Sequence, residues 1–222
     1  LQDTTAGRVI WQFTAYGNEE RPVAKTVWFE NATIWTCEES GVMLGADLIL
    51  HDGEILAVGV GLDPNAVFGT KVPEYETIDA RGKHITPGII DEHTHIAATR
   101  GINEGTQASS AEVSIETAVN SEDVNIYRQL AGGVTTAQIL HGSANPIGGQ
   151  SAIIKFRWGA SPQELIFDEA PSFIKFALGE NVKQSNWGNN YRSRFPQTRM
   201  GVEQVYYDHF YRAREYEQAW KD

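Results

Sequence analysis

Two histidines separated by one residue are the sharpest chemical feature of this sequence. His93 and His95 stand at the end of an apolar run that starts near Ile85. Residues two apart on a β-strand project to the same face, so both imidazoles can offer a nitrogen to one metal ion. Asp91 or Glu92 can orient a ring from outside the ligand shell. The spacing therefore predicts a divalent-metal site, while a bare His-x-His pattern also occurs on strands that simply face solvent.

The residues before this pair have the pattern of a small, mostly antiparallel β domain. Lys25 to Cys37 is rich in β-branched and aromatic side chains, and Gly41 to Gly59 holds two apolar runs around Asp52-Gly53. An Asp-Gly dipeptide between two such runs indicates a tight hairpin turn. We therefore expect residues 1–84 to form a β domain in which the strands of Lys25 to Gly59 are antiparallel.

Beyond residue 84, strand and helix patterns alternate. Val134 to Leu140 predicts a strand, and Ser121 to Ala131 has helical spacing before a Gly-Gly stop. Thr198 to Asp222 repeats apolar residues every three or four positions, which predicts a long amphipathic helix. This alternation favours parallel βα units, so residues 85–222 are expected to be α/β. An eight-stranded βα barrel needs about 250 residues, so this part holds roughly three to four units or forms a small open layer.

A longer segment around the histidine pair carries a family resemblance. Ile78 to His95 closely resembles the signature of the amidohydrolase superfamily, which comprises metal-dependent hydrolases, and Gly132 to Thr136 is similar to that family's second barrel strand. Two further segments, residues 148–155 and 173–183, resemble imidazolonepropionase-like members.

This resemblance implies both a fold and a cofactor. The fold would be α/β, with the N-terminal half of a β-sandwich in residues 1–84. Residues 85–222 would then form the first three to four βα units of an incomplete (β/α)8 barrel. His93 and His95 would be ligands of a divalent metal. Zinc is the first expectation, and iron and manganese stay open because imidazole suits several metals.

The family completes its metal site in one of two ways, and the sequence offers a candidate for each. A carboxylated lysine would be Lys175, which alternation turns inward if Ile174 and Phe176 face the helices. A glutamate at a strand end would be Glu180, which lies in a glycine-flanked turn at the rim where barrel sites form. We favour Glu180 because it needs no modification. The alternative is a solvated acid at Glu180 and a structural ion pair at Lys175.

Two further features lie in regions that would face the site. His141 falls where the second barrel strand would open, so it is a candidate for substrate binding, with a hydrogen-bonded loop histidine as the alternative. Trp187, Tyr191 and residues 192–199 form an aromatic and basic segment, which we interpret as a surface loop rather than a substrate lid.

Two function hypotheses follow. The first is a hydrolase of C–N bonds in an amide, cyclic amide or peptide, acting through a metal-activated water. In the family, two more histidines and a catalytic aspartate come from later barrel strands, so the sequence identifies no catalytic residue here. The second hypothesis is therefore a catalytically silent fragment or a non-enzymatic module, because a catalytic zinc normally has three protein ligands.

Composition excludes several other classes of function. Acidic residues outnumber basic ones 29 to 18, so the net charge of −11 offers no general attraction for nucleic acid or an anionic membrane. No apolar run approaches the roughly 18 residues of a membrane span, and residues 1–5 lack the pattern of a signal peptide. The single cysteine, Cys37, excludes an intrachain disulfide. The expected partner is a small-molecule amide or peptide, and the location stays open between the cytoplasm and export after signal removal.

A partial barrel also predicts an uncovered apolar surface. Three to four βα units cannot close a barrel, so the last strand and its helices would keep unpaired or half-covered edges. The missing C-terminal half or a second copy of the chain would cover them. The residues expected at this surface are Phe173 to Leu178, Val205, Tyr206, Phe210 and Trp220.

Overall fold

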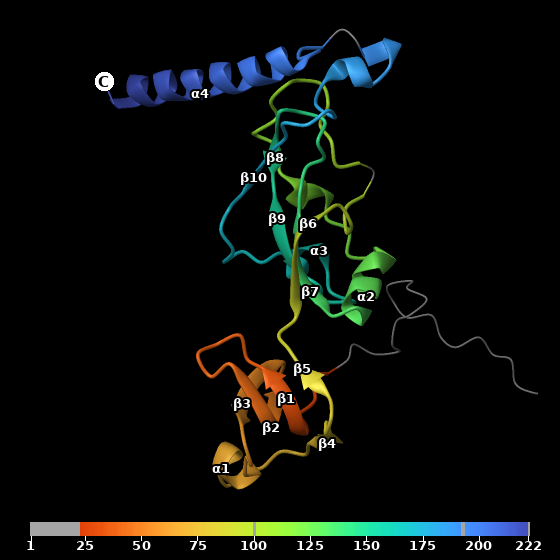
Figure 1. The fold of residues 1–222 in the computed structure, drawn as a ribbon, viewed down its shortest axis with the longest axis vertical. Helices are drawn as coiled ribbons and strands as arrows, with labels where there is room; N and C mark the ends of the chain where they lie inside the picture. The colour runs from red at the N-terminus through yellow and green to blue at the C-terminus, as the bar shows by residue number, and fades with distance from the viewer. Residues whose placement is uncertain (1–22, 100, 192–193, 222) are drawn as a thin grey trace, which may run out of the picture. The chain divides into compact units, whose positions relative to one another are not determined.

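The computed structural model describes residues 23–99, 101–191 and 194–221. The chain divides into two compact units, and the boundary in the sequence lies between Gly88 and Ile89. Each unit contains its own sheets and its own buried apolar cluster. Figure 1 shows their elements by label.

The first unit contains one five-stranded sheet (Figure 1). Its strand order is β3-β2-β1-β4, and β5 also pairs with β1. The pairs β1–β2 and β2–β3 are antiparallel, whereas β4 and β5 run parallel to β1. The elements are β1 (Val27–Trp35), β2 (Val42–His51), β3 (Glu54–Gly59), the short helix α1 (Pro64–Phe68), β4 (Glu76–Asp79) and β5 (His84–Ile85).

The predicted hairpin in this unit is confirmed. Strands β2 and β3 are antiparallel, with His51 opposite Glu54, so Asp52 and Gly53 form the turn between them. Both turn residues have a positive φ, 51° for Asp52 and 82° for Gly53, which is the conformation that Asp-Gly hairpin turns require. Side chains that alternate inward from β1 and β2 form the core of this sheet: Ala32, Ile34, Ala46 and Leu48, with Ala80 beside them.

The second unit begins with a parallel strand pair. Strands β6 (Ile89–Thr94) and β7 (Val134–Ile139) are parallel, and the chain between them contains the helix α2 (Val124–Ala131). Asp123 caps α2 by accepting from the Asn125 amide, and Gly132 ends the helix. The predicted helix and the strand after it are thus present. The other elements are β8 (Ile147–Gln150), β9 (Ala152–Lys155), β10 (Ile174–Phe176), the helices α3 (Pro162–Leu165) and α4 (Arg199–Lys221), and the 3-10 turns η1 (Ile115–Ala118), η2 (Gln184–Asn186) and η3 (Asn189–Tyr191).

The expected series of three to four parallel βα units is not what the described residues form. Strand β9 runs antiparallel to β7, and β10 pairs antiparallel with β8 in a separate two-stranded sheet. A parallel neighbour needs a crossover that carries the chain back across the sheet, usually a helix. The chain between β7 and β9 forms a loop and the strand β8 instead, so β9 returns in the opposite direction.

The core of the second unit surrounds the sheet β6-β7-β9. Ile139, Ile154 and Leu165 are fully buried there, together with Ile126 from α2. These side chains come from the helix, the two strands and the segment after β9, so burying them fixes how these elements pack.

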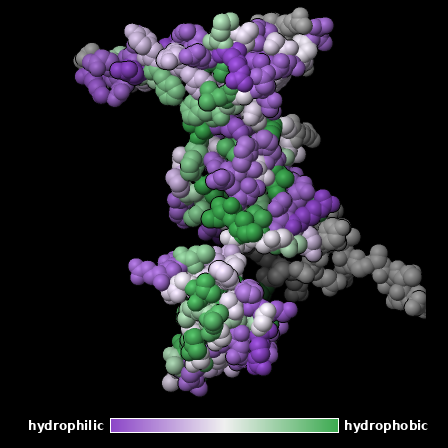
Figure 2. All heavy atoms as spheres, in the orientation of Figure 1, coloured by the Kyte–Doolittle hydropathy of each residue, from purple (hydrophilic) through white to green (hydrophobic). Residues whose placement is uncertain are grey.

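Helix α4 is the long helix that the spacing predicts, but only its first turns are covered. Gly201, Val202 and Val205 are its buried residues, and Tyr206 donates its hydroxyl to the carbonyl oxygens of Pro146 and Ala177. Figure 2 shows its outer part mostly in hydrophilic colours, because charged residues separate the aromatic ones. The aromatic side chains exposed along it are Tyr207, Phe210, Tyr211, Tyr216 and Trp220.

The uncovered surface that we expected is present in part. Phe173, Phe176 and Leu178 are exposed, as are Phe210 and Trp220 on α4. Val205 is buried, in contrast to the expectation, because the start of α4 packs on Val182 and Ala177. Among the described residues, no helix has the length and apolar character required to cross a membrane.

Candidate functional site

Strand β6 presents the two histidines side by side. His93 lies within the strand and His95 directly after its last residue, and the centroids of their rings are 5.2 Å apart. Both side chains are exposed. The carboxylate of Asp91 accepts from the backbone amide of His93, so it fixes the backbone of this strand end and not an imidazole ring.

Strand β10 brings Lys175 to the same place. Lys175 is buried, whereas Phe176 beside it is exposed, as the alternation of a strand requires. Its Nζ atom lies 3.3 Å from Nε2 of His93. If the Lys175 amine is protonated it can only donate, and the hydrogen bond then needs a His93 Nε2 without a proton.

The surroundings of this contact favour uncharged groups. Burial lowers the pKa of the Lys175 amine. Although His95 is largely exposed, the partial desolvation of its ring is the largest cause of its lowered pKa, followed by the neighbouring charges of His93, Lys175 and His141. Both shifts increase the fraction of neutral amine and neutral imidazole, which are the forms that bind metals.

His141 lies near these residues but has no free ring nitrogen. It is almost fully buried, its Nδ1 donates to the carbonyl of Gly142, and its Nε2 accepts from the amide of Glu104, both at 2.7 Å. This arrangement defines a neutral imidazole with the proton on Nδ1. The predicted substrate contact through His141 therefore has no ring nitrogen available, because protein groups occupy both.

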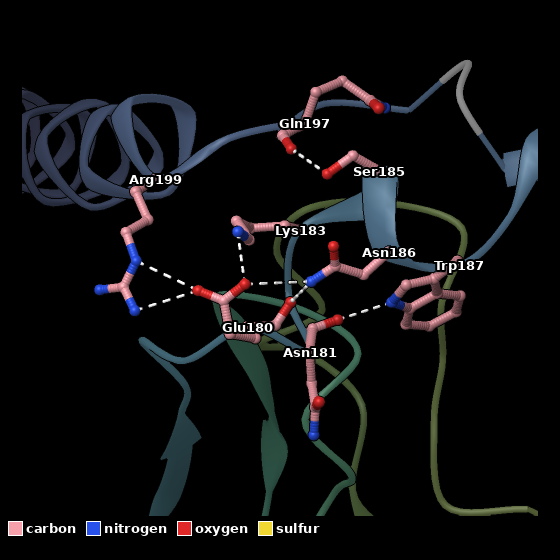
Figure 3. Close-up of polar contacts among 8 residues, drawn as sticks. All are labelled: Glu180, Asn181, Lys183, Ser185, Asn186, Trp187, Gln197 and Arg199. Atoms are coloured by element: carbon pink, nitrogen blue, oxygen red, sulfur yellow. Dashed lines mark hydrogen bonds and ion pairs between the residues drawn. The ribbon is translucent and has the colours of Figure 1, made fainter.

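Glu180 lies in a different set of contacts. Its carboxylate is 2.5 Å from Nζ of Lys183 and accepts from Arg199 and Asn186 (Figure 3). The hydrogen bond from Lys183 is the largest cause that lowers the Glu180 pKa to about 2, followed by those from Asn186 and Arg199. These bonds join the segment after β10 to the start of α4. None of these bonds involves the histidine pair, whereas the Lys175 amine contacts His93.

Hydrogen bonds within the segment after Glu180 hold this loop together. The indole of Trp187 donates to the carbonyl of Asn181, and Ser185 donates to the carbonyl of Gln197 (Figure 3). Figure 3 also shows the Asn181 side chain pointing away from the Glu180 carboxylate. Arg192, which the basic segment included, lies outside the described residues.

Arg194 is a residue that our sequence interpretation did not single out. Its guanidinium donates to the carbonyl oxygens of Gly105, Gln107 and Ala144 and to Oδ1 of Asn145. Asn145 in turn donates to the carbonyl of Glu104, whose amide holds His141. No local pattern marks such an arginine, because the acceptors of its guanidinium are backbone or amide oxygens far away in the sequence.

The ligand types of this site suit a divalent metal, but the set is small. Two imidazoles and one lysine nitrogen come together, and imidazole is a preferred ligand of zinc. Within the described residues, no group of three or more histidine, cysteine, aspartate or glutamate side chains is arranged to hold a metal. Lys175 is the further nitrogen-bearing side chain that contacts the pair, through His93.

Comparisons with known proteins give the family. The chain is 32% identical over 209 residues to a protein named Amidohydrolase tasK from Hapsidospora irregularis, a match that covers 80% of this chain and 20% of that protein. It also resembles the crystal structure of an amidohydrolase from Thermotoga maritima, with a TM-score of 0.72 and 33% identity over 88% of this chain and 49% of that one. The chain is related to the amidohydrolase superfamily. No family model matches it.

A shorter match links the chain to an amidohydrolase relative with a named substrate class. An imidazolonepropionase from Geobacillus kaustophilus is 39% identical over 56 residues, a quarter of this chain. The Hapsidospora irregularis protein and the Thermotoga maritima structure each match most of this chain. The matched part is only 20% of the first protein and 49% of the second, so this chain spans about a fifth to a half of their length.

Proposed function

We propose that this chain carries part of the metal centre of a hydrolase that cleaves a C–N bond in an amide, a cyclic amide or a peptide. The observation that carries the proposal is the position of the Lys175 amine beside His93, in a chain related to amidohydrolases. The names of the relatives support a hydrolase of amide-type bonds, and the imidazole pair supports a divalent metal.

In this proposal His93, His95 and Lys175 hold the metal, with zinc as the first expectation. The Lys175 amine, whose pKa is lowered by burial, attacks the carbon of carbon dioxide and releases one proton to solvent, which leaves a carbamate on Nζ. The carbamate oxygens, and not the amine nitrogen, would then be the atoms through which Lys175 holds the metal. When bound, such a metal would lower the pKa of a coordinated water toward neutrality and polarise the substrate carbonyl.

The chain's own residues prepare this site before any metal binds. Pairing of β6 with β7 fixes the strand that carries the histidines, and pairing of β10 with β8 fixes Lys175. The hydrogen bonds of His141 to Glu104 and Gly142 fix the orientation of its ring beside the site.

Metal content and hydrolysis together test the proposal. The 222-residue chain, stripped with a chelator and reloaded with zinc, is expected to hold one zinc per chain. It is then assayed on N-acyl amides, cyclic amides and dipeptides. H93A and H95A should lose the metal, and H209Q should keep it, since the His209 ring only donates to the carbonyl of Val205 within α4. Metal bound equally by all four proteins would show that the histidine pair is not the site.

The second hypothesis, a catalytically silent or non-enzymatic chain, predicts a different combination. Stoichiometric zinc without hydrolysis of any substrate would support a metal-binding part that lacks its general base. A chain that binds no metal and hydrolyses no substrate would contradict the proposed function for these 222 residues.

A further inference from the structure

Two adjacent glycines in β8 lie against the residues of the candidate site. Gly148 and Gly149 are buried, and neither has the positive φ that would require glycine for its backbone conformation. The reason for a glycine at these positions is therefore space.

At Gly148 that space is taken by two residues of the site. A Cβ added there would lie 3.0 Å from Nδ1 of His141 and 3.2 Å from the Cβ of Lys175. Contacts this short are closer than ordinary van der Waals distances between such atoms, so a neighbour would have to move. At Gly149 the nearest atoms belong to Val113, at 2.7 Å, with His141 Cδ2 at 3.4 Å.

Neither neighbour of Gly148 can move freely. Protein groups hold both ring nitrogens of His141, and the ring is buried. The stem of Lys175 belongs to β10, which pairs with β8 through Ile174 opposite Gln150 and Phe176 opposite Ile147. A side chain at position 148 would therefore push β10 away from β8, and the Lys175 amine would follow its stem.

We propose that Gly148 is a positioning residue of the metal site: its missing side chain lets the His141 ring and the Lys175 stem lie against one stretch of backbone, which places the Lys175 amine beside His93. This inference rests on the proposed function for the role of Lys175 as a metal ligand. The role of His141 is then to pack against Gly148 with its ring held in place, rather than to contact substrate.

The test compares G148A with G179A in the full 222-residue chain. Gly179 is the matched control, because a Cβ there would meet no atom within 4 Å and its φ is not in the left-handed region. Crystal structures of both variants give the distance from Lys175 Nζ to His93 Nε2, and calorimetric titration with zinc gives the affinity. We expect G179A to keep the 3.3 Å contact and the zinc affinity of the unchanged chain.

G148A should lengthen the contact by a few tenths of an ångström. It should also bind zinc at least about ten-fold more weakly, the size of effect seen when residues that orient metal ligands are changed. Adding H141A to G148A removes the imidazole ring that a side chain at position 148 would meet. The double variant should therefore recover part of the Lys175–His93 contact and of the zinc affinity. If G148A does not fold, the double variant is compared with H141A alone, and equal zinc affinity of these two would contradict the positioning role of Gly148.

Three results would contradict the positioning role of Gly148 or distinguish it from the proposed function. A G148A variant that keeps both the contact and the zinc affinity would show that Gly148 does not position Lys175. A lower melting temperature with unchanged zinc affinity would show a purely structural role. If the unchanged chain binds no zinc, the proposed function fails, and the Lys175–His93 distance in G148A still decides the positioning role.

Discussion

The Lys175 amine lies 3.3 Å from Nε2 of His93, although 82 positions separate the two residues in the chain. The contact joins the end of a parallel strand pair to a separate two-stranded antiparallel sheet. It brings Lys175, one of the two residues that the family resemblance allowed as a further ligand, beside the histidine pair.

Replacing Lys175 should remove the metal site without unfolding the chain. K175M keeps the length of the apolar stem but has no amine to form a carbamate, so we expect zinc affinity to fall by at least about ten-fold. K183M is the matched control, because Lys183 pairs with Glu180 instead. Zinc titration checks both. A loss of zinc in E180Q but not in K175M would return Glu180 to the metal site.

Glu180 should make the chain sensitive to acid. Its pKa is lowered from 4.5 to about 2, so the stability that its ionised form provides is present above pH 4.5 and is lost as the pH falls toward 2. E180Q should therefore have a lower unfolding midpoint than the unchanged chain at pH 7, and the difference should shrink below pH 4.5. Urea unfolding at several pH values measures this. E203Q, on the exposed side of α4, should show no such trend.

Arg194 should stabilise the loops of the second unit because the N–H groups of its guanidinium donate to several loop acceptors. R194K keeps the charge but cannot reach all four acceptors, so we expect a loss of about 1.5–3 kcal/mol in the free energy of unfolding. R157K should change it by less than about 0.5 kcal/mol, because Arg157 makes an exposed contact with the carbonyl of Glu164. Equal stability of the two variants would contradict this role for Arg194.

Two isoleucines in the same sheet should differ sharply in their effect on stability. Ile154 is fully buried in the core of the second unit, so I154A should cost about 2–5 kcal/mol. Ile90 is 70% exposed, so I90A should stay within about 0.5 kcal/mol. Chemical denaturation measures both values. A large loss in I90A would mean that another surface covers β6 in solution.

Much of the local structure could be predicted because its causes lie close together in the chain. Asp52 and Gly53 form the expected turn, since these residue types tolerate a positive φ. The spacing of apolar residues identified α2 and α4, and the spacing of His93 and His95 placed their rings side by side.

Only the tertiary structure decided how these elements pair and which residue accompanies the histidines. The direction of β9 depends on the path of the loop before it, and no periodicity within the strand encodes that path. Along the chain both Lys175 and Glu180 are candidates, and Glu180 is preferred because it needs no modification. In the structure β10 pairs with β8 and Lys175 contacts His93, while Lys183 and Arg199 bind Glu180. A contact between distant residues depends on burial and strand register across the whole unit, and neither is a property of a local segment.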